Sequence, residues 1–147
     1  MIALIQRVTQ ASVSVDGDTL AQIDTGMLAL IGVEKADTVD SAHRLADRIC
    51  GYRIFPDESG RMNLDLLSAG GQLLLVPQFT LAADTRKGRR PGFSTAASPA
   101  QATELFDQLT NCLQPRVGKL GLGRFGANMQ VALVNDGPVT FWLQVDP

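Results

Sequence analysis

Alternating apolar and polar positions at the start of the chain predict β-strands with one buried face. These strands lie near Ile2–Val8 and Ser12–Val15, and Asp16-Gly17 follows them as a hairpin signal. A continuous apolar run at Met27–Val33 indicates a central strand. Further strands are predicted at Arg53–Phe55, Gln72–Val76, Met129–Val134 and Val139–Val145.

Two other segments repeat their apolar residues at helical spacing. The first follows Asp37-Thr38, has Gly51 placed to end it, and contains Val39, Ala42, Leu45, Ala46, Ile49 and Cys50. The second begins with the capping sequence Ser98-Pro99-Ala100-Gln101 and contains Ala102, Leu105, Phe106, Leu109, Cys112 and Leu113. Each segment predicts a helix that buries one face.

The order of these elements predicts the fold class. Strands come first, two helices then interleave with strands, and strands close the chain, which indicates an α+β fold. We expect a mixed, largely antiparallel β-sheet with a barrel-like core and the two main helices on one side. Gly118–Gly126 is rich in glycine and is predicted to be a loop. No composition shift divides the chain, so residues 1–147 are expected to form a single domain.

Composition and charge narrow the functional classes. Hydrophobic residues make up 45% of the chain and charged residues 19%, as in a soluble globular protein. No membrane-spanning run or signal peptide is evident, so we expect a cytoplasmic protein with no membrane partner. Cys50 and Cys112 lack the spacing of a redox or metal motif and are expected to be reduced, packed thiols. The net charge of −2 means that any RNA contact must be local.

One local basic cluster stands out at Arg86-Lys87-Gly88-Arg89-Arg90. Such a run is usually a solvated surface loop, but its position after an apolar strand also allows contact with a phosphate group. The sequence leaves both interpretations open.

The sequence contains none of the familiar catalytic motifs. The single histidine, His43, falls in the first predicted helix and is interpreted as a surface or rim residue. No His and Cys cluster has metal-ligand spacing, so we expect neither a metal nor a cofactor. Gly121–Gly126 matches GxGxxG, but it precedes a predicted strand and not a helix, so it is not interpreted as a dinucleotide site. An enzyme built from this chain would work without a conventional base.

The segment Asn135-Asp136-Gly137-Pro138-Val139-Thr140 places a proline between two predicted strands. Strand interiors reject proline, and an X-Pro bond is where a cis peptide becomes accessible. Gly137 has no Cβ, so the backbone here could approach a ligand closely. An ordinary turn is the alternative, because Gly-Pro pairs mostly mark turns.

Four segments in this order resemble the D-aminoacyl-tRNA deacylase family, formerly called D-tyrosyl-tRNA deacylases. They are Met1–Val8, Gly51–Phe55, Gln78–Thr85 and Asn135–Thr140, and the resemblance runs nearly end to end. It implies a homodimer with active sites at the dimer interface. It also implies hydrolysis of the ester between a D-amino acid and the 3′ adenosine of tRNA.

The resemblance assigns roles residue by residue. The family motif Ser-Gln-Phe-Thr-Leu is matched by Gln78, Phe79, Thr80 and Leu81, and Gln78, Phe79 and Thr80 are the implied catalytic residues. Pro77 replaces the family's serine and loses both a hydroxyl and an N–H group, which puts any substrate contact there in doubt.

The remaining implied residues bind substrate. Gly137-Pro138 matches the family's Gly-cisPro pair, which one subunit inserts into the pocket of the other. Phe125 and Met129 resemble residues that line the pocket for the terminal adenosine. Arg7 resembles an arginine that holds the Gly-cisPro loop. For Phe125, Met129 and Arg7, ordinary packing or a surface salt bridge is the alternative.

These residues suggest a mechanism. Backbone N–H groups of Phe79 and Thr80 could stabilise an oxyanion without any ionisable side chain. Thr80 lacks a nearby base in the sequence, so we expect a positioning residue, with water or the ribose 2′-hydroxyl completing the reaction. A backbone gate at Gly137-Pro138 would exclude L side chains and admit glycine, which predicts activity on glycyl-tRNA. The alternatives are a non-catalytic tRNA 3′-end binding module and a general esterase.

Overall fold

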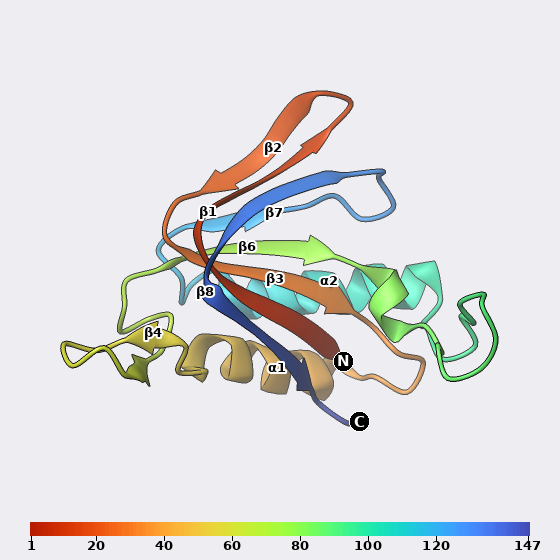
Figure 1. Ribbon diagram of the computed structural model, residues 1–147. Helices are drawn as coiled ribbons and strands as arrows, with labels where there is room; N and C mark the ends of the chain where they lie inside the picture. The colour runs from red at the N-terminus through yellow and green to blue at the C-terminus, as the bar shows by residue number, and fades with distance from the viewer.

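The computed structural model describes residues 1–147 and contains one large twisted sheet with two helices (Figure 1). The strands of the large sheet are β1 (Ile2–Val15), β2 (Asp18–Ile23), β3 (Gly26–Gly32), β6 (Gln72–Pro77), β7 (Leu120–Leu122) and β8 (Gln130–Gln144). Two short strands, β4 (Phe55–Pro56) and β5 (Met62–Leu64), form a separate hairpin. The strand predicted at Arg53–Phe55 therefore begins two residues later than expected, at Phe55.

The large sheet is mixed and curls toward closure. β1 pairs antiparallel with β2, β3 and β8, whereas β3 pairs parallel with β6 and β6 with β7. β3 pairs with the first half of β1, and β2 pairs with the second half. β2 also lies close to β7. The strands therefore nearly complete a barrel, and the predicted α+β fold with a barrel-like core is confirmed.

Helices α1 (Val39–Gly51) and α2 (Pro99–Leu113) cover the same side of the sheet (Figure 1). Thr38 caps α1 by accepting a hydrogen bond from the Ser41 N–H, and Ser98 caps α2 by accepting one from the Gln101 N–H. Their apolar faces join a core of 25 buried residues that also includes side chains of β1, β3 and β6. Both helices were correctly predicted because their apolar spacing and their caps agree.

Three other predicted elements differ from the structure. The two strands predicted before residue 16 are one strand, β1, and the two at the end of the chain are one strand, β8. The predicted Gly118–Gly126 loop contains β7, which was too short for a periodic signal. Gly121 permits this strand, because a Cβ at that position would lie only 3.0 Å from the Cβ of Ala21 and 3.1 Å from a methyl carbon of Leu74.

The remaining sequence predictions concern single residues. Cys50 and Cys112 are both free thiols, as predicted, and burial raises the pKa of Cys50. Cys50 is fully buried, whereas Cys112 is only partly buried. His43 is exposed on α1, as predicted. None of the helices combines the length and the apolar character needed to cross a bilayer.

Candidate active site

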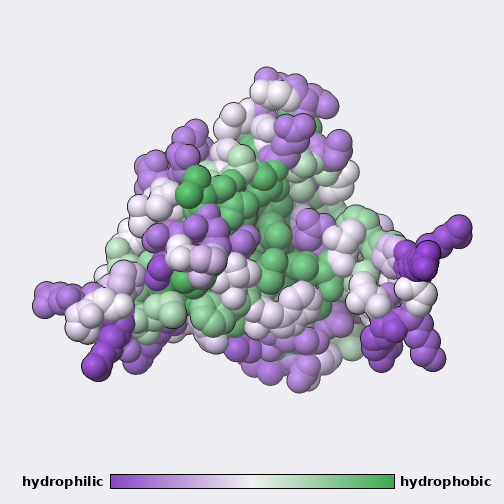
Figure 2. All heavy atoms as spheres, in the orientation of Figure 1, coloured by the Kyte–Doolittle hydropathy of each residue, from purple (hydrophilic) through white to green (hydrophobic).

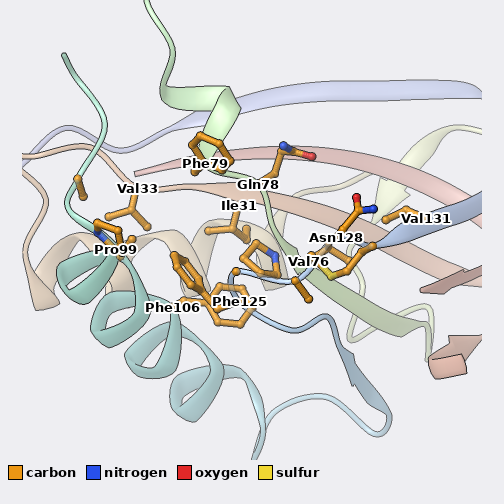
Figure 3. A pocket seen from close by; sticks show the side chains of 16 residues that line it. Ile31, Val33, Val76, Gln78, Phe79, Pro99, Phe106, Phe125, Asn128 and Val131 are labelled. Atoms are coloured by element: carbon orange, nitrogen blue, oxygen red, sulfur yellow. The ribbon is translucent and has the colours of Figure 1, made fainter. Parts of the chain in front are cut away.

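A cavity of about 490 Å³ opens where the ends of β3 and β6 meet the start of α2 and the segment between β7 and β8. Figure 3 shows Gln78 and Phe79 on one side of this cavity and Phe106 and Phe125 on the other. The lining residues are Ile31, Val33, Val76, Pro77, Gln78, Phe79, Ala97, Pro99, Ala102, Phe106, Phe125, Gly126, Ala127, Asn128, Met129 and Val131. Eleven of the 16 are hydrophobic. Apolar walls with a few polar groups are typical of a small-molecule site.

The Gln78-Phe79-Thr80 motif lies where β6 ends. Pro77 is the last residue of β6 and pairs with Ile31, and the Gln78 N–H then donates to the Ile31 carbonyl at 2.7 Å. Immediately afterwards the chain enters a short 3₁₀ helix, η1 (Phe79–Ala82). The first N–H groups of a helical turn have no acceptor within that turn, and the Gln78 side chain does not cap them. The Phe79 and Thr80 N–H groups therefore have no acceptor within the turn, and Phe79 lines the cavity.

The Thr80 side chain is exposed and does not line the cavity. Its hydroxyl oxygen accepts a hydrogen bond from Nε2 of Gln78. This bond fixes the two side chains relative to each other. An amide N–H donor cannot remove a proton from the hydroxyl, so the contact does not activate Thr80 as a nucleophile.

The opposite wall combines predicted and unpredicted residues. Phe125 and Met129 line the cavity, and the Met129 sulfur accepts a hydrogen bond from the Arg124 N–H at 3.3 Å. Phe106 of α2 and Asn128 also line the cavity, and the sequence assigned neither of them to the site. Phe106 is 5% exposed and follows the helical core pattern, so nothing distinguished it from a purely structural residue.

The cavity wall carries no ionisable side chain, because the lining residues include no Asp, Glu, His, Cys, Tyr, Lys or Arg. The residue types present are aliphatic, aromatic, methionine, glycine, proline and two amides. No group of three or more His, Cys, Asp or Glu side chains is arranged to hold a metal ion. The chemistry available from the wall is therefore hydrogen bonding, apolar contact and aromatic stacking.

Gly137 and Pro138 lie outside this cavity, within β8, and are exposed. Gly137 lies six positions along the strand from Val131, which lines the cavity. At about 3.3 Å per residue, this is roughly 20 Å along the strand. The peptide bond between Gly137 and Pro138 is cis, and Gly137 has φ of +142°. The structure therefore does not bring Gly137-Pro138 and the motif residues together within one chain.

Arg7 anchors the segment before Gly137. Its Nε donates to the carbonyl of Asp136 at 3.0 Å and lies 3.3 Å from the Asp136 carboxylate. Its Nη1 donates to the carbonyl of Ile54 at 2.8 Å. The guanidinium thus ties β8 to the residue just before β4.

Asn135 completes this support, and its role was not predicted from the sequence. Its Nδ2 donates to the carbonyls of Arg7 and Val139, each at 2.9 Å. The β1–β8 register shifts on either side of Val8, so the regular ladder is interrupted there. The Asn135 amide replaces ladder bonds that the interruption removes.

The basic cluster lies in an exposed loop between η1 and α2. Asp84 and Gly92 close this loop with two backbone hydrogen bonds of 2.7 and 3.0 Å. Arg86 contacts the Asp84 carboxylate with two nitrogens, at 2.9 and 2.8 Å, and these hydrogen bonds hold the pKa of Asp84 well below its usual range.

Comparisons with known proteins identify the family of the chain. The family model described as D-Tyr-tRNA(Tyr) deacylase matches residues 4–144. A D-aminoacyl-tRNA deacylase of Erwinia tasmaniensis is 59% identical over 99% of this chain and 100% of its own. Its counterpart in Thioalkalivibrio sulfidiphilus is 58% identical over 100% of this chain and 99% of its own.

A solved structure described as a c-Myc DNA unwinding element binding protein has the same fold, with a TM-score of 0.95. It is 35% identical in sequence, and the match covers 100% of both chains. A family match over most of the chain and full-length relatives of high identity confirm the resemblance inferred from the motifs. The chain therefore belongs to the D-Tyr-tRNA(Tyr) deacylase family of hydrolases.

Proposed function

We propose that this protein hydrolyses the ester bond of D-aminoacyl-tRNA and releases the D-amino acid and tRNA. One observation carries the proposal: the motif residues Gln78 and Phe79 share a cavity with Phe125 and Met129, and that cavity has no ionisable side chain. Ester hydrolysis is compatible with such a site because backbone donors can stabilise its oxyanion. The names of the curated relatives support the substrate class.

The terminal adenosine of tRNA is the group that we place in the cavity. Its volume of about 490 Å³ suits a nucleoside, and Phe125 offers an aromatic ring for stacking on the base. Gln78 and Asn128 supply the polar groups that a base or ribose requires. The ester then lies near the rim, where the Phe79 and Thr80 amides are located.

In the proposed reaction a water molecule attacks the ester carbonyl carbon, and the carbonyl oxygen takes the negative charge. The Phe79 and Thr80 N–H groups donate to this oxyanion; removing one such donor typically slows an enzyme about 10²- to 10³-fold. The bond to the ribose oxygen breaks, and the proton from water passes to that oxygen, with the neighbouring 2′-hydroxyl as the relay. The products are a free D-amino acid and tRNA with an intact 3′ end.

Thr80 acts as a positioning residue in this scheme. Its hydroxyl is held by Gln78 and has no base beside it. We therefore expect Thr80→Ala to lower kcat/KM for D-tyrosyl-tRNA by about fivefold, because one hydrogen bond of about 1 kcal/mol is lost. Thr80→Ser, which keeps the hydroxyl, serves as the control. A Thr80→Ala rate as low as the uncatalysed rate would show that Thr80 is the nucleophile.

The chiral gate is proposed to be Gly137-Pro138 from a second copy of the chain. Within one chain this segment is exposed and lies outside the cavity, so a partner must supply it. β8 pairs only with β1, and it exposes Val134 and Trp142 to 47% and 50%. Figure 2 shows apolar side chains gathered over the strands of the main sheet. A free strand edge beside apolar surface supports association into a homodimer.

A complementation experiment tests the shared site. Phe125→Glu should block the cavity, and Gly137→Val should disable the gate, so each homodimer should be inactive. The two variants are co-expressed with different carboxy-terminal tags, because the amino group of Met1 is buried against Asp37. The purified heterodimer contains one site with both parts intact and should regain activity toward D-tyrosyl-tRNA. An inactive heterodimer would mean that cavity and gate act within one chain.

The substrate assay tests the function itself. Purified protein is incubated with D-tyrosyl-, L-tyrosyl- and glycyl-tRNA, and release of the amino acid is followed. We expect cleavage of the D and glycyl substrates but not of the L substrate, because a rigid backbone gate collides only with an L side chain. A tRNA-end binding module would cleave none of them, and a general esterase would cleave all three. Resistance of glycyl-tRNA alone would refute the steric gate but not the deacylase activity.

A further inference from the structure

The loop between Asp84 and Gly92 concentrates positive charge beside the cavity. From Pro77 to Thr103 the chain carries four cationic side chains and one carboxylate, whereas the whole protein has a net charge of −2. The single carboxylate, Asp84, is occupied by Arg86. Lys87, Arg89 and Arg90 belong to none of the five ion pairs in the structure, and all three are exposed.

The base of this loop is held in place. The Asp84 and Gly92 backbones bond to each other, and the Ala97 N–H donates to the Val33 carbonyl at 3.0 Å. The loop therefore connects η1 to α2, and both of these elements contribute residues to the cavity wall. Residues 85–91 extend away from the body, and hydrophilic side chains cover this edge of the molecule (Figure 2).

An exposed aromatic pair lies between the cavity and the loop. Phe79 lines the cavity, and its ring centroid is 5.2 Å from that of Phe93, which follows the basic cluster. The two residues are 57% and 42% exposed, which is unusual for large apolar side chains. Aromatic rings beside unpaired cations are the combination with which proteins bind single-stranded nucleic acid, because bases stack on the rings and phosphates contact the cations.

We propose that Phe93, Lys87, Arg89 and Arg90 form a second binding surface for the tRNA end, upstream of the terminal adenosine. This inference rests on the proposed function, which places that adenosine in the cavity. Phe93 stacks on an unpaired base that leaves the cavity mouth. The three cations contact the phosphates that follow, since the loop arms of about three residues reach on the order of 10 Å beyond their base. Arg86 shapes the loop and is not part of this surface.

The test compares two substrates that share the scissile ester. One is D-tyrosyl-tRNA, and the other is the D-tyrosyl ester of adenosine, which fills the cavity but lacks the upstream nucleotides. The variant Lys87→Gln/Arg89→Gln/Arg90→Gln should lose at least about tenfold in kcat/KM on the tRNA, mainly through KM, and at most twofold on the adenosine ester. Its salt dependence should weaken, with a log–log slope smaller by about 2, or about 0.7 for each lost contact. Phe93→Ala should show the same substrate difference without the change in slope.

A matched control neutralises three other exposed cations, Arg53, Arg61 and Lys119, and should behave like the wild type on both substrates. Equal losses on both substrates, or no loss on either, would overturn the inference. Binding of a fluorescent acceptor-stem minihelix that carries no amino acid at its 3′ end gives an independent readout, because it does not require turnover. If the wild type binds this RNA more tightly than the loop variant but cleaves neither ester, the surface stands and the proposed deacylase activity fails.

Discussion

Removing the Arg7 guanidinium is the most direct perturbation of the Gly137-Pro138 segment that leaves the segment itself unchanged. In Arg7→Ala the carbonyls of Asp136 and Ile54 each lose a charged donor. Arg7→Lys keeps the positive charge but cannot donate in two fixed directions. The pair of variants therefore separates charge from geometry.

The expected loss of unfolding free energy in Arg7→Ala follows from how exposed the contacts of Arg7 are. A hydrogen bond from a charged donor is worth about 1.5–3 kcal/mol. The Arg7 side chain is only 13% exposed, but Asp136 is 48% exposed, so its ion pair adds at most about 1 kcal/mol and its carbonyl can recover water. We take the lower value for each bond and expect Arg7→Ala to lose about 3 kcal/mol of unfolding free energy. About half of that loss, roughly 1.5 kcal/mol, is the energy that holds the Gly137-Pro138 segment in place. It corresponds to a little more than a tenfold change in the equilibrium between the placed and the displaced segment.

The assays are urea unfolding and the kcat/KM for D-tyrosyl-tRNA. We expect Arg7→Ala to lower kcat/KM about tenfold or more and to narrow the difference between D- and L-tyrosyl-tRNA, with Arg7→Lys in between. Arg48→Ala is the matched control, because Arg48 Nη1 donates to the Gln144 carbonyl at 2.7 Å, at the far end of the same strand. It should leave the D/L ratio unchanged. A normal D/L ratio in Arg7→Ala, with the stability loss present, would refute the positioning role of Arg7.

Three other predictions concern stability. Gly137→Ala should cost about 1–3 kcal/mol in urea unfolding, because the new Cβ would lie 2.5 Å from Val139 Cγ2 at a φ of +142°; Gly60→Ala, with no atom within 4 Å, should cost less, and an equal cost would contradict the crowding argument. Asp37→Asn should cost about 3–5 kcal/mol, because the carboxylate pairs with the buried Met1 ammonium group and accepts from the Glu34 N–H; the exposed Asp40→Asn should cost less than about 1 kcal/mol, and similar losses would refute the role of burial. Hydrogen bonds from Ser59, Asn63 and the Arg61 backbone lower the pKa of Asp57 from 3.8 to about 2. The contribution of Asp57 to folding stability is therefore present above pH 4 and is lost as the pH falls through 2. The stability difference between wild type and Asp57→Asn should shrink over that range, and a constant difference would contradict the assignment.

The fold was predictable where local signals agree. The first helix has a cap at Thr38, an apolar stripe and a glycine at its end, and each signal predicts the same element. Strand boundaries were predicted wrongly where the pairing partners of a strand decide its length. β1 is continuous because β3 covers its first half and β2 its second half, and a local pattern cannot show which partners a strand will have.

The site was predictable only as separate motifs. Gln78-Phe79 and Phe125 were identified from the sequence, but their common cavity depends on α2, which contributes Phe106 and Ala102. Phe106 follows the core period of the helix, so its position in the site carried no signal of its own. Asn135 was likewise missed, because its role arises from a register shift between two strands far apart in the chain.

By itself, the sequence determined the family, the two helices and the identity of the motif residues, since these depend on residue type and short-range spacing. Only the tertiary structure decided which of those residues meet. It put Gln78, Phe79, Phe125 and Met129 around one cavity and left Gly137-Pro138 outside it. The reason is physical: periodicity fixes which face of an element is apolar, whereas the pairing of β8 with β1 and the packing of α2 against the sheet fix where each face lies in space.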